Sequence, residues 1–193
     1  MQPKRIVVTG GPGGGKTSVW RELVSTHGPQ LRGVPEVATL LFQHVFPGVQ
    51  SLDERRAVQR AIFSVQQNLE LIHEARRESD QVLLCDRGVP DGAGYWPEGP
   101  LAFFEAMGLD WEREILRYDA VLFLETAAAS GLSIAAGNTI RTESLEAAVR
   151  VDEQLRSVWA KHPNCRFIAC EAEFATKLER GSAVLREWLG AAE

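Results

Sequence analysis

The chain has 193 residues and a mass of 21.3 kDa, which is the size of one ordinary folded domain. Hydrophobic residues make up 45% and charged residues 24% of it, and these average values exclude disordered, collagen-like and disulfide-scaffold classes. The formal net charge is -5 and no long basic run is present, so nucleic acid is not expected as a main partner.

Apolar strands and periodic helices are expected to alternate along the chain. In chain order they are a strand at 5–9, a helix at 16–26, a strand at 33–36, a helix at 36–46, a helix at 52–79, a strand at 81–86, a loop at 87–100, helices at 101–107 and 110–117, a strand at 120–124, a flexible connection at 127–138, a helix at 144–161, a strand at 165–169 and a closing helix from Phe174 to Trp188. This alternation predicts an α/β fold with a parallel sheet and helices on both faces.

The three cysteines, Cys85, Cys165 and Cys170, show no metal-type spacing, so reduced thiols are expected. No apolar run reaches about 18 residues. The first predicted strand begins within five residues of Met1, which leaves no room for a signal peptide. We therefore expect a cytoplasmic protein without a membrane span.

A phosphate-binding loop is the strongest chemical motif. It fits the pattern G-x-x-x-x-G-K-[ST] between a predicted strand and a predicted helix, which is the context that supports such a match. The nucleotide-binding residues are expected to be Gly10, Gly11, Pro12, Gly13, Gly14, Gly15, Lys16, Thr17 and Ser18. Glycines allow backbone N–H groups to surround the phosphates, and the helix adds its positive end. Lys16 would contact the β- and γ-phosphates of ATP, and Thr17 would hold Mg²⁺.

A second motif, Asp86-Arg87-Gly88, closes the third predicted strand. An acid at this edge of the sheet is suited to orient magnesium or to accept the proton of an attacking hydroxyl. Arg87 would hold a phosphate or a substrate group. The alternative is a strand-ending Asp that only caps a turn.

Candidate substrate residues lie on the long helix and in the loop after the third strand. The apolar stripe of the helix contains Val58, Ile62, Val65, Leu69 and Ile72, and a stripe one residue away contains Gln59, Phe63, Gln66 and Glu70. An amide beside an aromatic ring suits a flat ligand, although a solvated helix shoulder is the common alternative. Asp91 and Tyr95 lie in a loop of the kind that carries binding residues, but Asp91 is also typical turn chemistry.

These motifs, together with Pro35-Glu36 and Arg141-Thr142-Glu143, resemble the AAA-type P-loop family that includes the ribosylnicotinamide kinase domain of NadR. The chain is more distantly similar to thymidylate and deoxynucleoside kinases. The resemblance implies a P-loop NTPase fold of the kinase-like branch, with a five-stranded parallel sheet in the order 2-3-1-4-5.

The resemblance also implies roles for single residues. Glu36 would contact the acceptor or its magnesium, and Asp86 and Arg87 would flank the transferred phosphoryl group. Arg141 would belong to a small mobile lid around residues 126–145 of a single domain, 1–193. Kinase lids usually bring several arginines, yet residues 127–140 contain no basic residue, which leaves Arg141 and Arg150 for the phosphates.

The sequence thus predicts an ATP-binding enzyme, with three classes left open. The first is a small-molecule kinase that transfers the γ-phosphoryl group of Mg-ATP to a nucleoside- or nucleotide-like acceptor, with Lys16, Asp86, Arg87 and Arg141 as catalytic residues. The second is an NTPase that uses water, and the third is a nucleotide-gated regulatory protein. A GTPase switch is disfavoured because no N-K-x-D motif follows the fourth predicted strand.

Overall fold

The computed structural model describes residues 4–46, 48–126, 145–170 and 173–190. Their elements are β1 (Arg5–Thr9), α1 (Lys16–Thr26), β2 (Leu31–Val34), α2 (Val37–His44), α3 (Leu52–Ala75), β3 (Val82–Asp86), the 3-10 helix η1 (Val89–Tyr95), α4 (Pro100–Met107), α5 (Trp111–Ile115), β4 (Ala120–Leu124), α6 (Leu145–Trp159), β5 (Cys165–Ile168) and α7 (Phe174–Leu189). The segment predicted as a lid, with Arg141, lies almost wholly outside the described residues.

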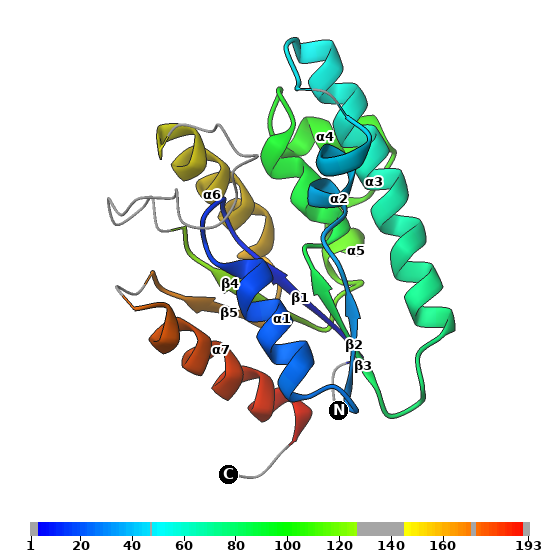
Figure 1. The fold of residues 1–193 in the computed structure, drawn as a ribbon. Helices are drawn as coiled ribbons and strands as arrows, with labels where there is room; N and C mark the ends of the chain where they lie inside the picture. Colours follow the sequence, from blue (N-terminus) through cyan, green and yellow to red (C-terminus); the bar gives the residue numbers. More distant parts are fainter. Residues whose placement is uncertain (1–3, 47, 127–144, 171–172, 191–193) are drawn as a thin grey trace.

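The five strands form one sheet in the order β2-β3-β1-β4-β5, and every neighbouring pair is parallel. This confirms the predicted fold class and strand order. Because β1 lies in the centre, the carboxyl ends of β1, β3 and β4 meet at one edge of the sheet (Figure 1). In open parallel sheets such an edge is where ligands bind.

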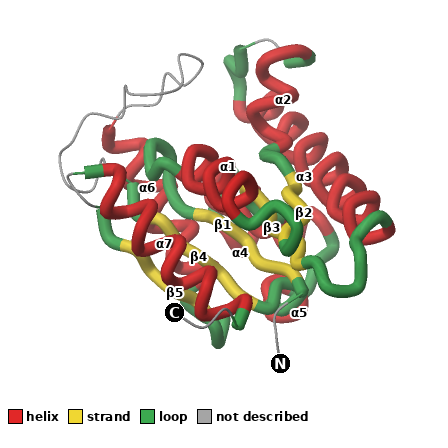
Figure 2. Tube along the Cα trace, turned by 60° about the horizontal axis from the view of Figure 1, so that its bottom comes forward, coloured by secondary structure: helices red, strands yellow, loops and turns green. Residues whose placement is uncertain are grey.

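Helices cover both faces of the sheet, as predicted, because side chains alternate along each strand. Ile6 and Val8 of β1 pack in a core with Val19 of α1 and Leu185 of α7. Val7, between them, belongs to a second core under α4, α5 and α6. Figure 2 shows α1 and α7 side by side over the sheet, in agreement with their direct contacts.

Helix α3 begins at Leu52 as predicted but ends at Ala75 rather than at residue 79, and its buried face is not the apolar stripe. A capping box at Ser51 starts the helix, and its buried residues are Gln59, Gln66 and Glu70, on the stripe adjacent to the apolar one. Val65 and Ile72 of the apolar stripe are 43% and 47% exposed. The polar face is turned inward because the end of β3 and η1 offer it a pocket and hydrogen-bond partners rather than an apolar sheet face.

Two smaller predictions also need correction. The second strand begins at Leu31 rather than Gly33, and the segment after β3, predicted to be a loop, contains η1. At the start of α7, Phe174 is 46% exposed. Within the described part of the chain, no helix is long and apolar enough to cross a membrane.

Candidate active site

The phosphate loop joins β1 to α1 and depends on glycines with positive φ. Gly10, Gly13 and Gly15 have φ of 129°, 75° and 77°, a region that side-chain-bearing residues rarely adopt. A Cβ on Gly10 would also lie only 2.0 Å from the carbonyl oxygen of Leu124 in β4. The sequence therefore uses glycine both for the turn and for the close approach to the sheet.

Two lysines lie against this loop. The Lys16 Nζ donates to the carbonyl oxygen of Gly11 at 2.6 Å, and its side chain is buried. Lys177 of α7, which sequence reasoning did not single out, donates to the carbonyl oxygens of Gly14 at 3.2 Å and Glu125 at 2.8 Å. Lys16 is the first residue of α1, and its side chain packs against the phosphate loop. The positive end of the α1 dipole faces this loop as well.

Asp86 lies at the carboxyl end of β3, and both of its carboxylate oxygens are buried without a hydrogen-bond partner among the described residues. Burial and the Glu36 carboxylate raise the pKa of Asp86 to about 6, while the Thr17 hydroxyl, Lys16 and Arg87 oppose the shift. A buried carboxylate without a partner lowers the stability of the fold unless a cation or a hydrogen-bond donor binds to it.

Asp86 and the hydroxyl of Thr17 are the oxygen ligands that could hold Mg²⁺, which takes few protein ligands and shares the rest with water and phosphates. In the described ranges, no group of three or more His, Cys, Asp or Glu side chains could hold a metal ion.

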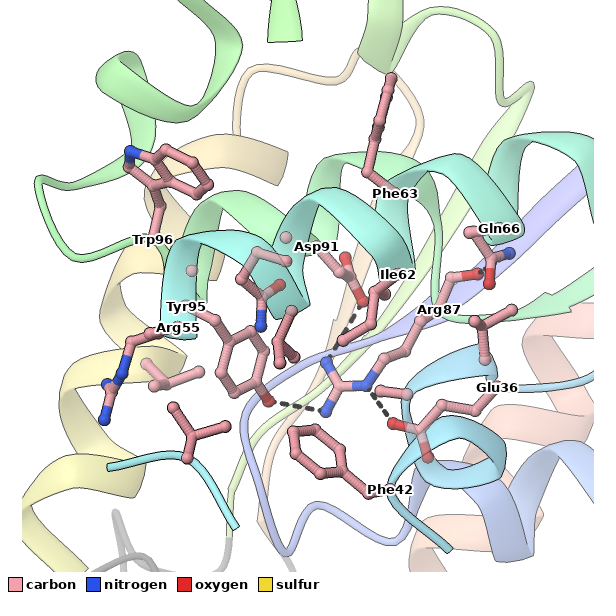
Figure 3. Close-up of a pocket in the computed structure, with 18 of the residues that line it drawn as sticks. Glu36, Phe42, Arg55, Ile62, Phe63, Gln66, Arg87, Asp91, Tyr95 and Trp96 are labelled. Atoms are coloured by element: carbon pink, nitrogen blue, oxygen red, sulfur yellow. Dashed lines mark hydrogen bonds and ion pairs between the residues drawn. The ribbon is translucent and has the colours of Figure 1, made fainter. Parts of the chain in front are cut away.

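Arg87 directly follows and is the only described residue other than glycine with a positive φ, 70°. Its guanidinium is fixed from three sides (Figure 3): Nε donates to Glu36 at 2.5 Å, Nη1 to Asp91 at 3.3 Å and Nη2 to the Tyr95 hydroxyl at 2.8 Å. Strained backbone and a buried charge are features that cluster at functional sites.

Glu36 and Asp91 hold Arg87 in different ways. Glu36, the residue before α2, accepts from Arg87 on one oxygen and from Thr39 at 2.5 Å on the other. Asp91 accepts hydrogen bonds only from groups of the protein among the described residues. These are the Thr9 hydroxyl at 2.7 Å, the Trp159 indole N–H at 2.7 Å and the Arg87 guanidinium. Asp91 therefore ties β1 and α6 to the guanidinium.

A cavity of about 700 Å³ adjoins Arg87. Its wall is formed by α2, α3, η1 and α6. Figure 3 shows Phe42 of α2, Ile62 of α3 and Tyr95 of η1 around the Arg87 guanidinium. Its aromatic side chains are Phe42, Phe46, Phe63, Tyr95 and Trp96. An apolar and aromatic pocket of this size with a few polar groups suits a flat small molecule.

Two buried amides of α3 line this pocket. Gln66 donates through Nε2 to Glu70 at 3.0 Å and to the Arg87 carbonyl oxygen at 3.4 Å. Gln59, two turns earlier, is 7% exposed and makes no hydrogen bond to another described residue. Gln59 belongs to the same helix stripe as Gln66, so its spacing was the signal for it.

Asp152 of α6 is a further contact of the phosphate loop. It is buried, and its Oδ1 accepts from the backbone N–H of Gly11 at 2.8 Å and of Thr126 at 3.1 Å. Because 141 residues separate Asp152 from Gly11, no local pattern could indicate this link. Neighbouring residues of α6, Val151 and Gln154, line the pocket, so one helix contacts both the phosphate loop and the pocket.

A family model matches this chain. The model of a family described as AAA domain matches residues 5–177 of this chain, which is most of its length. No protein of the curated collection matches the chain.

Among solved structures, the chain is similar to deoxyadenosine kinase from M. mycoides with bound dATP. The TM-score is 0.64 at 13% sequence identity, and the match covers 95% of this chain and 99% of that one. At this identity the match bears on the fold: it supports a P-loop kinase-like architecture over nearly the whole chain.

Proposed function

This chain belongs to the AAA domain family, and from that premise and the geometry of its site we propose that it is a small-molecule kinase. In this proposal it transfers the γ-phosphoryl group of Mg-ATP to a hydroxyl or phosphate of a nucleoside- or nucleotide-like acceptor. The observation that carries the proposal is the aromatic-lined cavity of about 700 Å³ beside Arg87. Hydrolysis by water needs no such cavity.

The donor would bind at the phosphate loop. Its glycine N–H groups and the start of α1 would surround the phosphates, and Lys16 would exchange its bond to Gly11 for the β- and γ-phosphate oxygens. Thr17 and Asp86 would hold Mg²⁺, which neutralises charge on the phosphates when it is bound. The unpartnered oxygens of Asp86 fit this role.

The acceptor would lie in the aromatic pocket, with its reacting oxygen toward Asp86 and Arg87. The new bond joins this oxygen to the γ-phosphorus, and the bond to the β–γ bridging oxygen breaks, which releases ADP. The acceptor proton would pass to one carboxylate oxygen of Asp86, at the edge of the sheet, while its other oxygen would orient a magnesium-bound water. Arg87, held by Glu36, Asp91 and Tyr95, would stabilise the charge that develops.

The match to deoxyadenosine kinase supports a nucleoside as the acceptor class, because that protein has the same architecture over nearly its whole length. The resemblance of the motifs to ribosylnicotinamide kinase domains adds ribosylnicotinamide as a candidate. Both candidates combine a ribose or deoxyribose hydroxyl with a flat ring, which suits an aromatic-lined pocket.

The test is an assay of ADP release with Mg-ATP, alone and with a panel of nucleosides, nucleotides and ribosylnicotinamide. Release that depends on one acceptor is expected, and Lys16→Ala is expected to abolish it. Steady release without any acceptor would instead favour an NTPase, and tight ATP binding without turnover would favour a regulatory protein.

A further inference from the structure

Lys177 joins the phosphate loop to the end of β4. It lies in α7 and is only 4% exposed, and its ammonium group donates to the carbonyl oxygen of Gly14 at 3.2 Å and to that of Glu125 at 2.8 Å. Glu125 directly follows β4. A Cβ on Gly14 would lie 2.9 Å from the carbonyl oxygen of Leu124, so the loop and the strand approach each other closely here. One buried side chain thus holds two carbonyl groups of neighbouring segments.

The bond from Lys177 fixes the direction of the peptide group between Gly14 and Gly15. In a planar trans peptide the C=O and the N–H point in opposite directions. Because the Gly14 carbonyl points to α7, the N–H of Gly15 points away from α7, toward the concave side of the loop where phosphates are expected. This N–H makes no hydrogen bond to another described residue, so it is available to a ligand.

Two other N–H groups of the loop are already used within the protein. That of Gly11 donates to Asp152 at 2.8 Å, and that of Gly14 donates to the Gly11 carbonyl oxygen at 3.3 Å. Gly15 directly precedes α1, so its N–H adds to the positive end of that helix. The orientation of this one peptide group therefore bears directly on phosphate binding.

The Gly14–Gly15 peptide group would turn over easily without Lys177. Its rotation changes ψ of Gly14 and φ of Gly15, and both residues lack the Cβ that restricts these angles. Without the ammonium group, the carbonyl oxygens of Gly14 and Glu125 would lose a shared donor, and a buried carbonyl without a partner is unfavourable. A turned peptide would place the Gly14 oxygen on the concave side of the loop, where it would repel phosphates.

From these contacts we propose that Lys177 is a positioning residue for the nucleotide: it holds the Gly14–Gly15 peptide group with its N–H toward the phosphates and does not contact the nucleotide itself. The proposal rests on nucleotide binding at the phosphate loop, as in the function proposed above, and it gives a role to a residue outside the motif of that loop. It concerns the binding of phosphates and requires no phosphoryl transfer.

The experiment compares the wild type with Lys177→Met, which keeps an unbranched side chain and removes the ammonium group. Binding of ADP and of pyrophosphate is measured by calorimetry at a fixed Mg²⁺ concentration. We expect both dissociation constants to rise by the same factor, about tenfold or more, because an N–H donor to a charged phosphate is lost. Salt weakens a simple attraction between charges but does not restore a turned peptide, so the factor should be equal at about 0.05 M and about 0.5 M salt.

Two variants of the same helix serve as controls. Lys177→Arg keeps a cation with N–H donors, and its affinity for ADP should stay within about threefold of that of the wild type. Arg186→Met removes a cation from an exposed position further along α7 and should leave both dissociation constants unchanged. Thermal melts check that each variant is folded.

NMR of the ¹⁵N-labelled wild type tests the positioning role even if Lys177→Met does not fold. On addition of pyrophosphate, the amide signal of Gly15 should shift, because its N–H meets the ligand. The ammonium signal of Lys177 should stay in place, because the lysine keeps its carbonyl partners. In the folded Lys177→Met variant without ligand, the Gly15 signal should be broadened or doubled by exchange between the two peptide orientations.

The outcomes separate this inference from the kinase function. Unchanged dissociation constants in Lys177→Met, or weaker binding of ADP but not of pyrophosphate, would overturn the inference. A Lys177 ammonium signal that shifts strongly with pyrophosphate would also overturn it, because the lysine would then contact the ligand. In these cases the wild type still binds ADP, and the kinase function stands. The expected changes in binding without any phosphoryl transfer would support the inference and refute the kinase function.

Discussion

Replacement of Asp91 tests whether this carboxylate supports the site from within or contacts the substrate. Its oxygens accept from Thr9, Trp159 and Arg87, and it is 3% exposed. Asp91→Ala leaves the hydroxyl and the indole N–H unpaired and removes one of two carboxylates that face Arg87. Loss of one partner of a buried ion pair costs about 3–5 kcal/mol.

The variant Asp91→Asn is the graded comparison. Its amide oxygen can still accept from the Thr9 hydroxyl and the Trp159 indole, both 2.7 Å from the same oxygen of Asp91. Its N–H₂ group, however, meets the Arg87 donor that lies 3.3 Å from the other oxygen. We expect a smaller loss of about 1–3 kcal/mol.

The assay is urea denaturation of the wild type and both variants without nucleotide, with thermal melts beside it. For a chain of this size, a loss of 3–5 kcal/mol in Asp91→Ala lowers Tm by about 10 °C. If Asp91→Ala unfolds within about 0.5 kcal/mol of the wild type while KM for the acceptor rises, the supporting role is refuted and Asp91 contacts the substrate instead.

Three further predictions concern the phosphate loop and its edge of the sheet. Lys16→Ala should lose ATP-dependent turnover while the free energy of unfolding without ATP stays within about 1 kcal/mol, because the lysine acts on phosphates; turnover at the wild-type rate would contradict this. Gly10→Ala should bind no ATP by calorimetry, because a Cβ would lie 2.0 Å from a backbone oxygen of β4; normal affinity would contradict the loop geometry. Asp86→Asn should lose phosphoryl transfer yet be more stable than the wild type in EDTA at pH 7, by about 3 kcal/mol. The folded pKa of Asp86, about 6, is above the ordinary value of 3.8, so the stability of the wild type falls as the pH rises from about 4 to about 6 and is level above that. The difference in stability between variant and wild type should therefore close below pH 4. A difference in stability between Asp86→Asn and the wild type that stayed the same from pH 4 to pH 7 would contradict the raised pKa of Asp86.

The sequence was sufficient for the fold because its signals are local. The β-branched run before Gly10, the glycine loop and the apolar strand that ends at Asp86 each indicate an element without reference to distant residues. Alternation of strands and helices then implies a parallel sheet. The family resemblance supplied the strand order, which the structure confirms.

The pocket was less accessible to sequence reasoning because its geometry depends on contacts between distant segments. Gln66 could be singled out by its spacing from Phe63, but its hydrogen bond to the carbonyl oxygen of Arg87, 21 positions later, could not. The links from Asp152 to Gly11 and from Trp159 to Asp91 join α6 to residues 141 and 68 positions earlier. No periodicity encodes such pairs.

The inward turn of the polar stripe of α3 has a related cause. Hydrophobic periodicity predicts the buried face only when the neighbouring surface is apolar. Here α3 forms one wall of the pocket beside Arg87. Gln59 and Gln66 therefore face the pocket, and Val65 is 43% exposed. At this pocket, the face of α3 that is buried is therefore not the face that its hydrophobic periodicity predicts.

The central claim, that phosphoryl groups pass from ATP to a small molecule in the pocket, is tested most directly by following the label of γ-³²P ATP. With Mg²⁺ and an accepted acceptor, the label should leave ATP and be found on the acceptor in amounts equal to the ADP formed. Label found only in inorganic phosphate, whether or not an acceptor is present, would contradict the account.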